Sequence, residues 1–228
     1  MSVAILCPTR DRPKELMSMI ESVRKTSDAT VLVWIDQDQR YRYPVEPPDW
    51  WERLGARVKY GERIGPVAAA NALVSENQDF DAYGFVTDNS TLTSKNWDSW
   101  LLGAIQALPG GLAVVSPWHD QGEHVDMPFV SRDWVNLVGW YACPECRQYC
   151  WPTVTGLIGE MTAICHAPKQ CFGLVHDYVG GYVSQSGKIL TRNQETRDRD
   201  ALKFYDFVAH QLSGIVDKLR HAMQPGVA

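Results

Sequence analysis

The sequence contains no long apolar run. No stretch of the 228 residues approaches the roughly 20 consecutive apolar residues that a membrane-spanning helix needs. The first residues enter an apolar, β-prone segment directly, without the basic leader and cleavage site of a secretory signal. With 45% hydrophobic and 21% charged residues, the composition is typical of a soluble globular protein. We therefore expect a cytoplasmic protein without a transmembrane segment.

Two further features are absent. The chain has no basic excess, since 27 acidic residues against 22 Lys and Arg give a net charge of -5, which does not favour a general nucleic-acid binder. No Gly-x-Gly-x-x-Gly follows the first apolar segment, and no Gly-x-x-x-x-Gly-Lys-Ser/Thr occurs anywhere. A standard dinucleotide site and a phosphate loop are therefore unsupported. A nucleotide site would need an aspartate for the base or ribose and a metal ion for the phosphates.

The first half of the sequence alternates between β-prone and helical segments. The expected strands are Val3–Cys7, Thr30–Ile35, Arg57–Tyr60, a segment ending before Asp88, and Leu112–Val115. The expected helices begin at Pro13 and cover Val67–Val74 and Trp97–Leu108. This alternation predicts an α/β fold with a doubly wound, mainly parallel sheet flanked by helices.

Polar loops follow three of the expected strands. They are Pro8-Thr9-Arg10, Asp36-Gln37-Asp38 and Thr87-Asp88-Asn89. Because parallel strands deliver these loops to one edge of the sheet, we expect them to converge. An aspartate beside an amide and hydroxyls suits a hard divalent cation that carries phosphate oxygens. The alternative is local, since the same residue types cap turns after strands.

Five motifs occur in a recognisable order: Cys7-Pro8-Thr9-Arg10-Asp11-Arg12-Pro13, Ile35-Asp36-Gln37-Asp38, Arg63-Ile64-Gly65, Asn71-Ala72-Leu73 and Asp88. Together they resemble compact GT-A glycosyltransferases of the family-2 type, especially small versions from bacteriophage genomes. The resemblance runs from residue 3 to about residue 210. It implies one GT-A-like domain over residues 1–215, with a nucleotide-binding half (1–115), an acceptor and metal half (116–190), a closing helix (191–215) and a tail (216–228).

The resemblance also implies roles for individual residues. A UDP-sugar donor would be bound by Pro8, Thr9, Arg10, Asp36, Arg63, Asn71 and Asp88. Asp88 would also bind the metal ion. Many relatives have a second acid beside this aspartate, whereas Asn89 here offers a carbonyl oxygen without charge.

A histidine completes the expected metal site. The apolar run from Phe172 to Val175 ends at His176, where related proteins carry a metal-binding histidine. An imidazole ligand favours Mn²⁺ over Mg²⁺, which prefers oxygen alone. The alternative is a histidine that is hydrogen-bonded to the backbone in a core or loop.

The identity of the catalytic base stays open. Inverting relatives carry an acid near the start of the helix after the acceptor loop, but residues 150–156 contain no carboxylate. Asp120 and Asp177 are candidate bases, and Glu123 and Asp126 lie in the same loop as Asp120. A retaining mechanism needs no such base, so the stereochemistry also stays open. Two alternative functions remain: a nucleotide-sugar or glycan-binding relative without chemistry, and a nucleotidyltransferase.

The acceptor is expected to be a hydroxyl. The phage-like resemblance implies that a hydroxymethylated base in DNA is one candidate, with the host cytoplasm as the location. A surface glycan, a lipid carrier or a small molecule fits equally well. Trp118 and Trp151, which we expect in loops, are candidates for acceptor contact.

The cysteines allow two interpretations. Cys143-Pro144-Glu145-Cys146 has the leading spacing of a structural zinc site, with Cys150 and Cys165 as further ligands. The alternative is a set of buried free thiols. Near the C-terminus, an apolar stripe predicts one helix packed on the domain, with the positions Ala201, Phe204, Tyr205, Val208, Leu212 and Ile215.

Overall fold

The computed structural model describes residues 1–43, 49–116, 127–166, 174–176 and 187–224. Within these residues, one sheet contains β1 (Val3–Thr9), β2 (Thr30–Asp36), β3 (Ala56–Gly61), β4 (Ala82–Phe85), β6 (Val114–Val115), β7 (Phe129–Ser131) and β8 (Cys165–His166). Their order is β3-β2-β1-β4-β7-β6-β8. The strands from β3 to β4 are mutually parallel, β7 is antiparallel to β4 and β6, and β6 is parallel to β8. The mainly parallel α/β sheet is confirmed.

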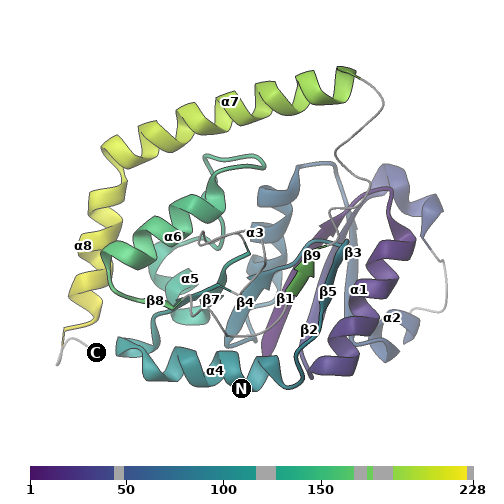
Figure 1. Ribbon diagram of the computed structural model, residues 1–228, viewed down its shortest axis with the longest axis horizontal. Coiled ribbons are helices and arrows are strands. Elements are labelled where there is room, and N and C mark those ends of the chain that lie inside the picture. The colour runs from purple at the N-terminus through teal and green to yellow at the C-terminus, as the bar shows by residue number, and fades with distance from the viewer. Residues whose placement is uncertain (44–48, 117–126, 167–173, 177–186, 225–228) are drawn as a thin grey trace.

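Helices cover both faces of the sheet (Figure 1). They are α1 (Pro13–Thr26), α2 (Asp49–Arg53), α3 (Pro66–Glu76), α4 (Trp97–Ala107), α5 (Arg132–Val138), α6 (Trp151–Met161), α7 (Gly187–His210) and α8 (Leu212–Ala222). Two short 3₁₀ helices are η1 (Gln37–Arg42) and η2 (Pro109–Gly111).

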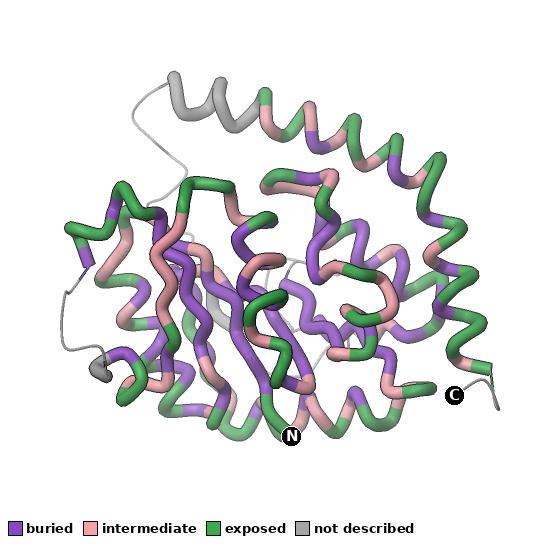
Figure 2. Tube along the Cα trace, turned by 180° about the vertical axis from the view of Figure 1, so that it is seen from behind, coloured by how far each residue is buried: buried purple, intermediate pink, exposed green. Residues whose placement is uncertain are grey.

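Alternating side chains of the strands enter two separate cores. In β1, Ala4 and Leu6 belong to the core under α3, α5, α6 and α8, whereas Ile5 and Cys7 belong to the core under α1 and α4. All four are fully buried, which explains why these strands are apolar throughout. Figure 2 shows the burial concentrated in the strands and on the inner sides of the helices.

Local sequence explains where two helices begin. Pro13 occupies the first turn of α1, where its missing N–H costs no hydrogen bond, and Leu16, Ile20 and Val23 give the helix a buried face. Gly65 precedes α3 with a φ of 86°, a conformation that glycine adopts without strain.

The prediction that Trp151 lies in a loop near an acceptor is wrong. Trp151 begins α6 and is 3% exposed. Its ring packs edge-on against Phe85, with the centroids 5.3 Å apart, and against Tyr141. Pro152 occupies the first turn of the helix, where proline is tolerated.

The C-terminal segment differs from its prediction in two ways. The single helix is two, α7 and α8, with Gln211 between them. Residues 216–222, expected as tail, belong to α8, whose Leu212, Val216 and Leu219 are buried in the core. Of the predicted stripe, Leu212 is buried and Phe204, Val208 and Ile215 pack against the core. Tyr205 is the exception, since it is 68% exposed and Phe207 is buried instead.

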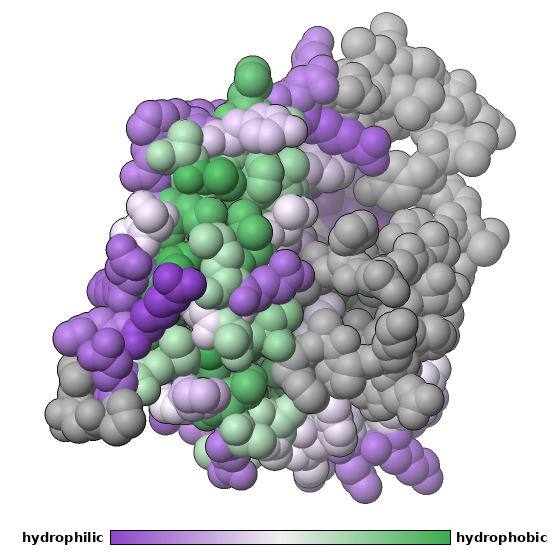
Figure 3. Space-filling model, turned by 60° about the vertical axis from the view of Figure 1, so that its left-hand side comes forward, coloured by the Kyte–Doolittle hydropathy of each residue, from purple (hydrophilic) through white to green (hydrophobic). Residues whose placement is uncertain are grey.

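Some large apolar side chains stay exposed, among them Leu202 and Tyr205 on α7 and Met161 at the end of α6. Figure 3 shows apolar residues gathered in a band on one face, with hydrophilic residues at its borders.

Among the residues that the structure describes, no helix combines the length and the apolar character needed to cross a membrane.

Candidate functional site

A cavity of about 810 Å³ lies at the carboxyl ends of β1 and β2. Its lining comes from five parts of the chain: Pro8, Thr9 and Arg10 with β1, Trp34 and Asp36 of β2, the residues Arg63, Ile64, Gly65, Pro66 and Ala69 at the start of α3, the pair Arg147 and Gln148, and Thr196 on α7. The edge formed by the carboxyl ends of parallel strands is the usual binding edge of such sheets.

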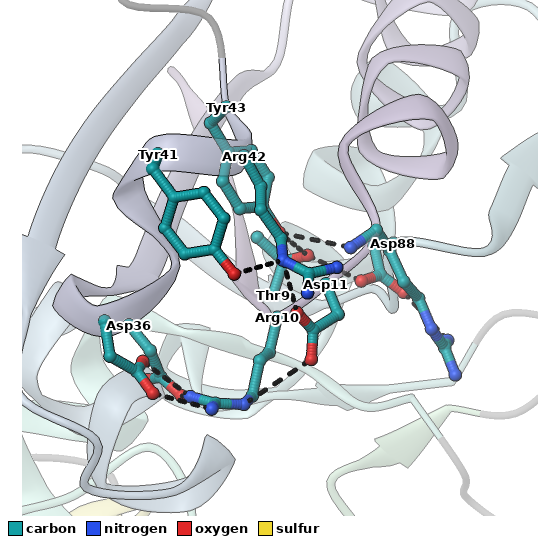
Figure 4. A network of polar contacts seen from close by, with 10 residues as sticks. Thr9, Arg10, Asp11, Asp36, Tyr41, Arg42, Tyr43 and Asp88 are labelled. Carbon is teal, nitrogen blue, oxygen red and sulfur yellow. Dashed lines mark hydrogen bonds and ion pairs between the residues drawn. The ribbon is translucent and has the colours of Figure 1, made fainter.

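Arg10 lies among the carboxylates of Asp11, Asp36 and Asp38 at this edge (Figure 4). Its Nη1 donates to Asp36 at 2.8 Å, and its two terminal nitrogens donate to the two oxygens of Asp38 at 2.7 Å each. The hydrogen bonds that Arg10 donates to Asp38, and then to Asp36, raise the pKa of Arg10, and the same contact lowers the pKa of Asp38. The positive charge of Arg10 is therefore compensated by the protein itself.

Asp88 is a buried carboxylate just beyond β4, 6% exposed. The Thr9 hydroxyl donates to its Oδ2 at 2.6 Å, and Arg12 Nη1 donates to its Oδ1 at 3.2 Å. Burial raises the pKa of Asp88, while the contacts with Thr9 and Arg12 act in the opposite direction. A carboxylate in such a place is stabilised in its charged form by a nearby cation.

The backbone brings His176 to the same region. A second, two-stranded sheet pairs β5 (Ser90–Leu92) with β9 (Leu174–His176), and Ser90 lies opposite His176. Ser90 is two residues after Asp88 and shares a 2.7 Å hydrogen bond with the Thr87 hydroxyl. The oxygens of Asp88, Asn89 and these hydroxyls are donors that suit a hard divalent cation. A metal site shared by Asp88 and His176 stays a prediction.

Five of the seven predicted donor-binding residues line the cavity: Pro8, Thr9, Arg10, Asp36 and Arg63. Asp88 adjoins it through Thr9. Asn71 does not line it, because its side chain donates to the Ala142 carbonyl at 2.8 Å and accepts from the backbone of Tyr141 and Ala142. The predicted residues Asp120, Glu123, Asp126, Asp177 and Trp118 lie outside the described residues.

Trp34 also lines the cavity, although no sequence motif indicates it. It reads as an ordinary β-strand residue, but its indole N–H donates to the Glu62 carbonyl at 3.3 Å. A Cβ added at Gly61 would meet the Trp34 ring at 2.1 Å, so only glycine lets this ring lie against β3. The ring therefore forms a fixed wall of the cavity.

Arg147, Gln148 and Thr196 were also missed, and a buried carboxylate explains their position. Asp200 on α7 is 0% exposed. Its oxygens accept hydrogen bonds from the backbone N–H groups of Arg147 (3.1 Å), Gln148 (2.8 Å) and Tyr149 (2.7 Å). Thr196 lies one turn earlier on the same helix. No local sequence pattern predicts this contact. Asp200 belongs to a run of alternating charges, which is typical of a solvent-exposed helix face.

The predicted zinc ligands are free thiols in this structure. Cys143 and Cys146 are buried, and the hydrogen bond between them lowers the pKa of Cys143 and raises that of Cys146. Burial raises the pKa of Cys165 to about 11. Among the described residues, no group of three His, Cys, Asp or Glu side chains is arranged to hold a metal ion. Zinc binding stays a prediction.

No protein-family model and no curated protein matches the sequence. Solved structures do match. A mannosyltransferase from Pyrobaculum calidifontis, solved with GDP-Man and Mn²⁺, is 12% identical with a TM-score of 0.60, over 96% of this chain and 69% of that one. Glucosyl-3-phosphoglycerate synthase from Mycobacterium tuberculosis, solved with Mn²⁺ and UDP, is 13% identical with a TM-score of 0.58, over 89% and 78%. The chain has a GT-A-like fold.

S. aureus TarS is a third similar structure. The TarS 1-349 complex with UDP-GlcNAc is 12% identical with a TM-score of 0.56, over 93% of this chain and 73% of that one. Other matches are partial, because the chain spans 36% of a longer TarS structure and 59% of TarS 1-349. The GT-A part of the resemblance inferred from sequence thus agrees with the fold.

Proposed function

We propose that this protein is a glycosyltransferase that moves a sugar from a nucleotide diphosphate sugar to a hydroxyl acceptor. The observation that carries the proposal is the cavity at the carboxyl edge of a GT-A-like sheet, with Asp36 in its lining and Asp88 adjoining it through Thr9. In this proposal Asp36 accepts hydrogen bonds from the base or ribose, and Pro8 and Thr9 border them.

A UDP-sugar is the favoured donor. The similar structures of TarS and glucosyl-3-phosphoglycerate synthase were solved with UDP-GlcNAc and UDP, whereas the mannosyltransferase was solved with GDP-Man. Asp88 and His176, with Asn89 as a neutral ligand, would hold Mn²⁺ in preference to Mg²⁺. The ion would neutralise negative charge on the leaving diphosphate. Asp120 and Asp177 are proposed as bases for the acceptor hydroxyl.

A more specific proposal concerns the acceptor. A hydroxymethylated base in bacteriophage DNA is one candidate hydroxyl, which would make the activity a DNA modification. The test is incubation of the protein with Mn²⁺, a panel of nucleotide sugars, and either hydroxymethylated or unmodified DNA, followed by mass spectrometry of the nucleosides. A mass increase of one sugar on the hydroxymethylated base alone supports this acceptor. If the donor is hydrolysed but no nucleoside is modified, DNA is rejected as the acceptor, and the proposal of a glycosyltransferase is retained.

The same incubation separates the two alternatives. The idea of a binding protein that lost its chemistry is motivated by Asn89 in place of a second acid and by the missing carboxylate at residues 150–156. Such a protein would bind a nucleotide sugar without releasing nucleoside diphosphate. Release of pyrophosphate from a nucleoside triphosphate would instead identify a nucleotidyltransferase.

A structural zinc ion at Cys143, Cys146, Cys150 and Cys165 is a separate proposal. It is supported by the short spacing of the first two cysteines and by the contact between their thiols. Elemental analysis of protein stripped of metal and reconstituted tests it. About one equivalent of retained zinc supports the site, and a value near zero rejects it.

A further inference from the structure

The arginines of the cavity differ in how their charge is compensated. Arg10 is paired with Asp36 and Asp38. Arg63 and Arg147 also line the cavity, and both are exposed residues. Arg63 acts on Asp38 only at longer range, and within the described residues neither Arg63 nor Arg147 forms an ion pair with a carboxylate. The cavity therefore has two positive charges that the described residues leave uncompensated.

These two arginines come from segments that lie side by side. The position where a Cβ would stand at Gly65 is 3.6 Å from the carbonyl oxygen of Arg147. The segment from Arg63 to Gly65 thus lies beside the backbone of Arg147. Two guanidinium groups on adjoining backbones suit a ligand with neighbouring anionic groups, because each planar fork matches the geometry of phosphate oxygens.

Asp200 fixes the backbone of Arg147. Both of its oxygens accept from Arg147 N at 3.1 Å, and the N–H groups of Gln148 and Tyr149 complete the contact. Arg199 Nη2, the nearest guanidinium nitrogen, is 3.9 Å from Asp200 Oδ1. Because Asp200 is fully buried, loss of this acceptor would leave three N–H groups without their partner. The backbone that carries Arg147 at the cavity is therefore held by the last third of the chain.

We propose that Arg63 and Arg147 form the diphosphate subsite of the cavity, and that Asp200 is the positioning residue that holds Arg147 there. This inference rests on the proposed nucleotide-sugar function. It implies that the diphosphate is recognised by the arginines themselves, so that part of the affinity persists when divalent cations are removed.

The test compares nucleoside with nucleoside diphosphate. Binding of uridine and UDP, and of guanosine and GDP, is measured by calorimetry in a chelator with the wild type, Arg63→Ala, Arg147→Ala, Asp200→Asn and the double variant Arg147→Ala/Asp200→Asn. Arg220→Ala is the matched control, since this exposed arginine on α8 donates to the Met161 carbonyl away from the cavity. We expect the wild type to bind one diphosphate at least ~10-fold more tightly than its nucleoside.

Arg63→Ala and Arg147→Ala should each weaken binding of the diphosphate by roughly 10-fold or more and leave the nucleoside affinity unchanged. Asp200→Asn should weaken diphosphate binding in the wild-type background but add little to Arg147→Ala, because the two changes act through one contact. A merely structural role of Asp200 would lower nucleoside and diphosphate affinity together, and would do so in both backgrounds.

Two results would overturn the subsite. One is diphosphate affinity unchanged in Arg147→Ala, which is informative even where Asp200→Asn fails to fold. The other is an equal loss for the nucleoside, which would move the effect to the base pocket. If the wild type binds no nucleoside diphosphate with or without Mn²⁺, the proposed function fails together with the subsite. Tight binding by the wild type with unaffected variants removes the subsite alone.

Discussion

Asp36 has two roles, because it accepts a hydrogen bond from Arg10 and also lines the cavity. We predict that Asp36→Ala weakens UDP binding by about 1–3 kcal/mol, the usual cost of removing a partner from a buried polar group. Asp38→Ala is the matched control, since Asp38 also pairs with Arg10 but does not line the cavity. Calorimetry on both variants checks this. Equal affinities for wild type and Asp36→Ala, with the fold intact, would remove Asp36 from the donor site.

Arg12 is a competitor for the proposed metal ion. Its guanidinium contacts Asp88 Oδ1, so a cation bound to that carboxylate has to share or displace it. We predict that Arg12→Gln binds Mn²⁺ several-fold more tightly than the wild type near neutral pH, because like charges at close range repel. Titration of free Mn²⁺ by electron paramagnetic resonance measures this. Arg42→Gln, which removes the nearby Arg42–Asp11 ion pair instead, should leave the affinity unchanged. Weaker Mn²⁺ binding by Arg12→Gln would contradict the competition.

At the scale of elements, local sequence was a good guide wherever burial alone decided the conformation. The strands predicted at Val3–Cys7, Thr30–Ile35 and Arg57–Tyr60 correspond to β1, β2 and β3. β1 and β2 lie inside a sheet that helices cover on both faces, so a continuous apolar run marks each of them, whereas the outer strand β3 alternates charged and apolar residues. Prediction was poorer where tertiary contacts decide the conformation. Of the predicted strand Leu112–Val115, only the last two residues form β6. The helix α8 was not predicted as a separate helix, and it packs on α5 and α6.

The turn into α3 provides a prediction at this scale. Gly65 has a φ of 86°, so a side chain there strains the backbone beside Arg63 and Arg147. We predict that Gly65→Ala lowers stability by about 1 kcal/mol and also weakens UDP binding. Gly103→Ala, inside α4 with no atom within 4 Å of the added Cβ, should instead raise stability by about 0.5–1 kcal/mol. Thermal unfolding of both variants tests this prediction. The midpoint should fall for Gly65→Ala and rise for Gly103→Ala.

At the scale of the whole molecule, the site divides into a part that sequence reveals and a part that it does not. Pro8, Thr9, Arg10 and Asp36 follow parallel strands, and the topology of the sheet brings them to one edge. Thr196 reaches that edge on α7, the long helix that Figure 1 shows above the sheet. Asp200 on the same helix holds the backbone of Arg147 and Gln148. Such a contact joins residues about 50 apart and leaves no periodic signal.

The C-terminal helices therefore belong to the core of the molecule. Leu219 on α8 is fully buried in the cluster that also contains α3, α5 and α6 residues. We predict that Leu219→Ala lowers the free energy of unfolding by about 2–5 kcal/mol. Leu202→Ala, 72% exposed on α7, should change it by less than about 0.5 kcal/mol. Denaturant unfolding compares the two. A neutral Leu219→Ala would mean that the segment is a loose tail.

Turnover of a nucleotide sugar by the intact protein tests the central claim most directly. The measurement is the release of UDP from a panel of UDP-sugars with Mn²⁺, by the wild type, Asp88→Ala and His176→Ala. We predict release by the wild type, its loss in chelator, and a reduction of at least ~100-fold in each variant, with thermal midpoints nearly unchanged without metal. Release at the wild-type rate by Asp88→Ala, or none by the wild type with any donor, would contradict the assignment of this cavity as the active site of a glycosyltransferase.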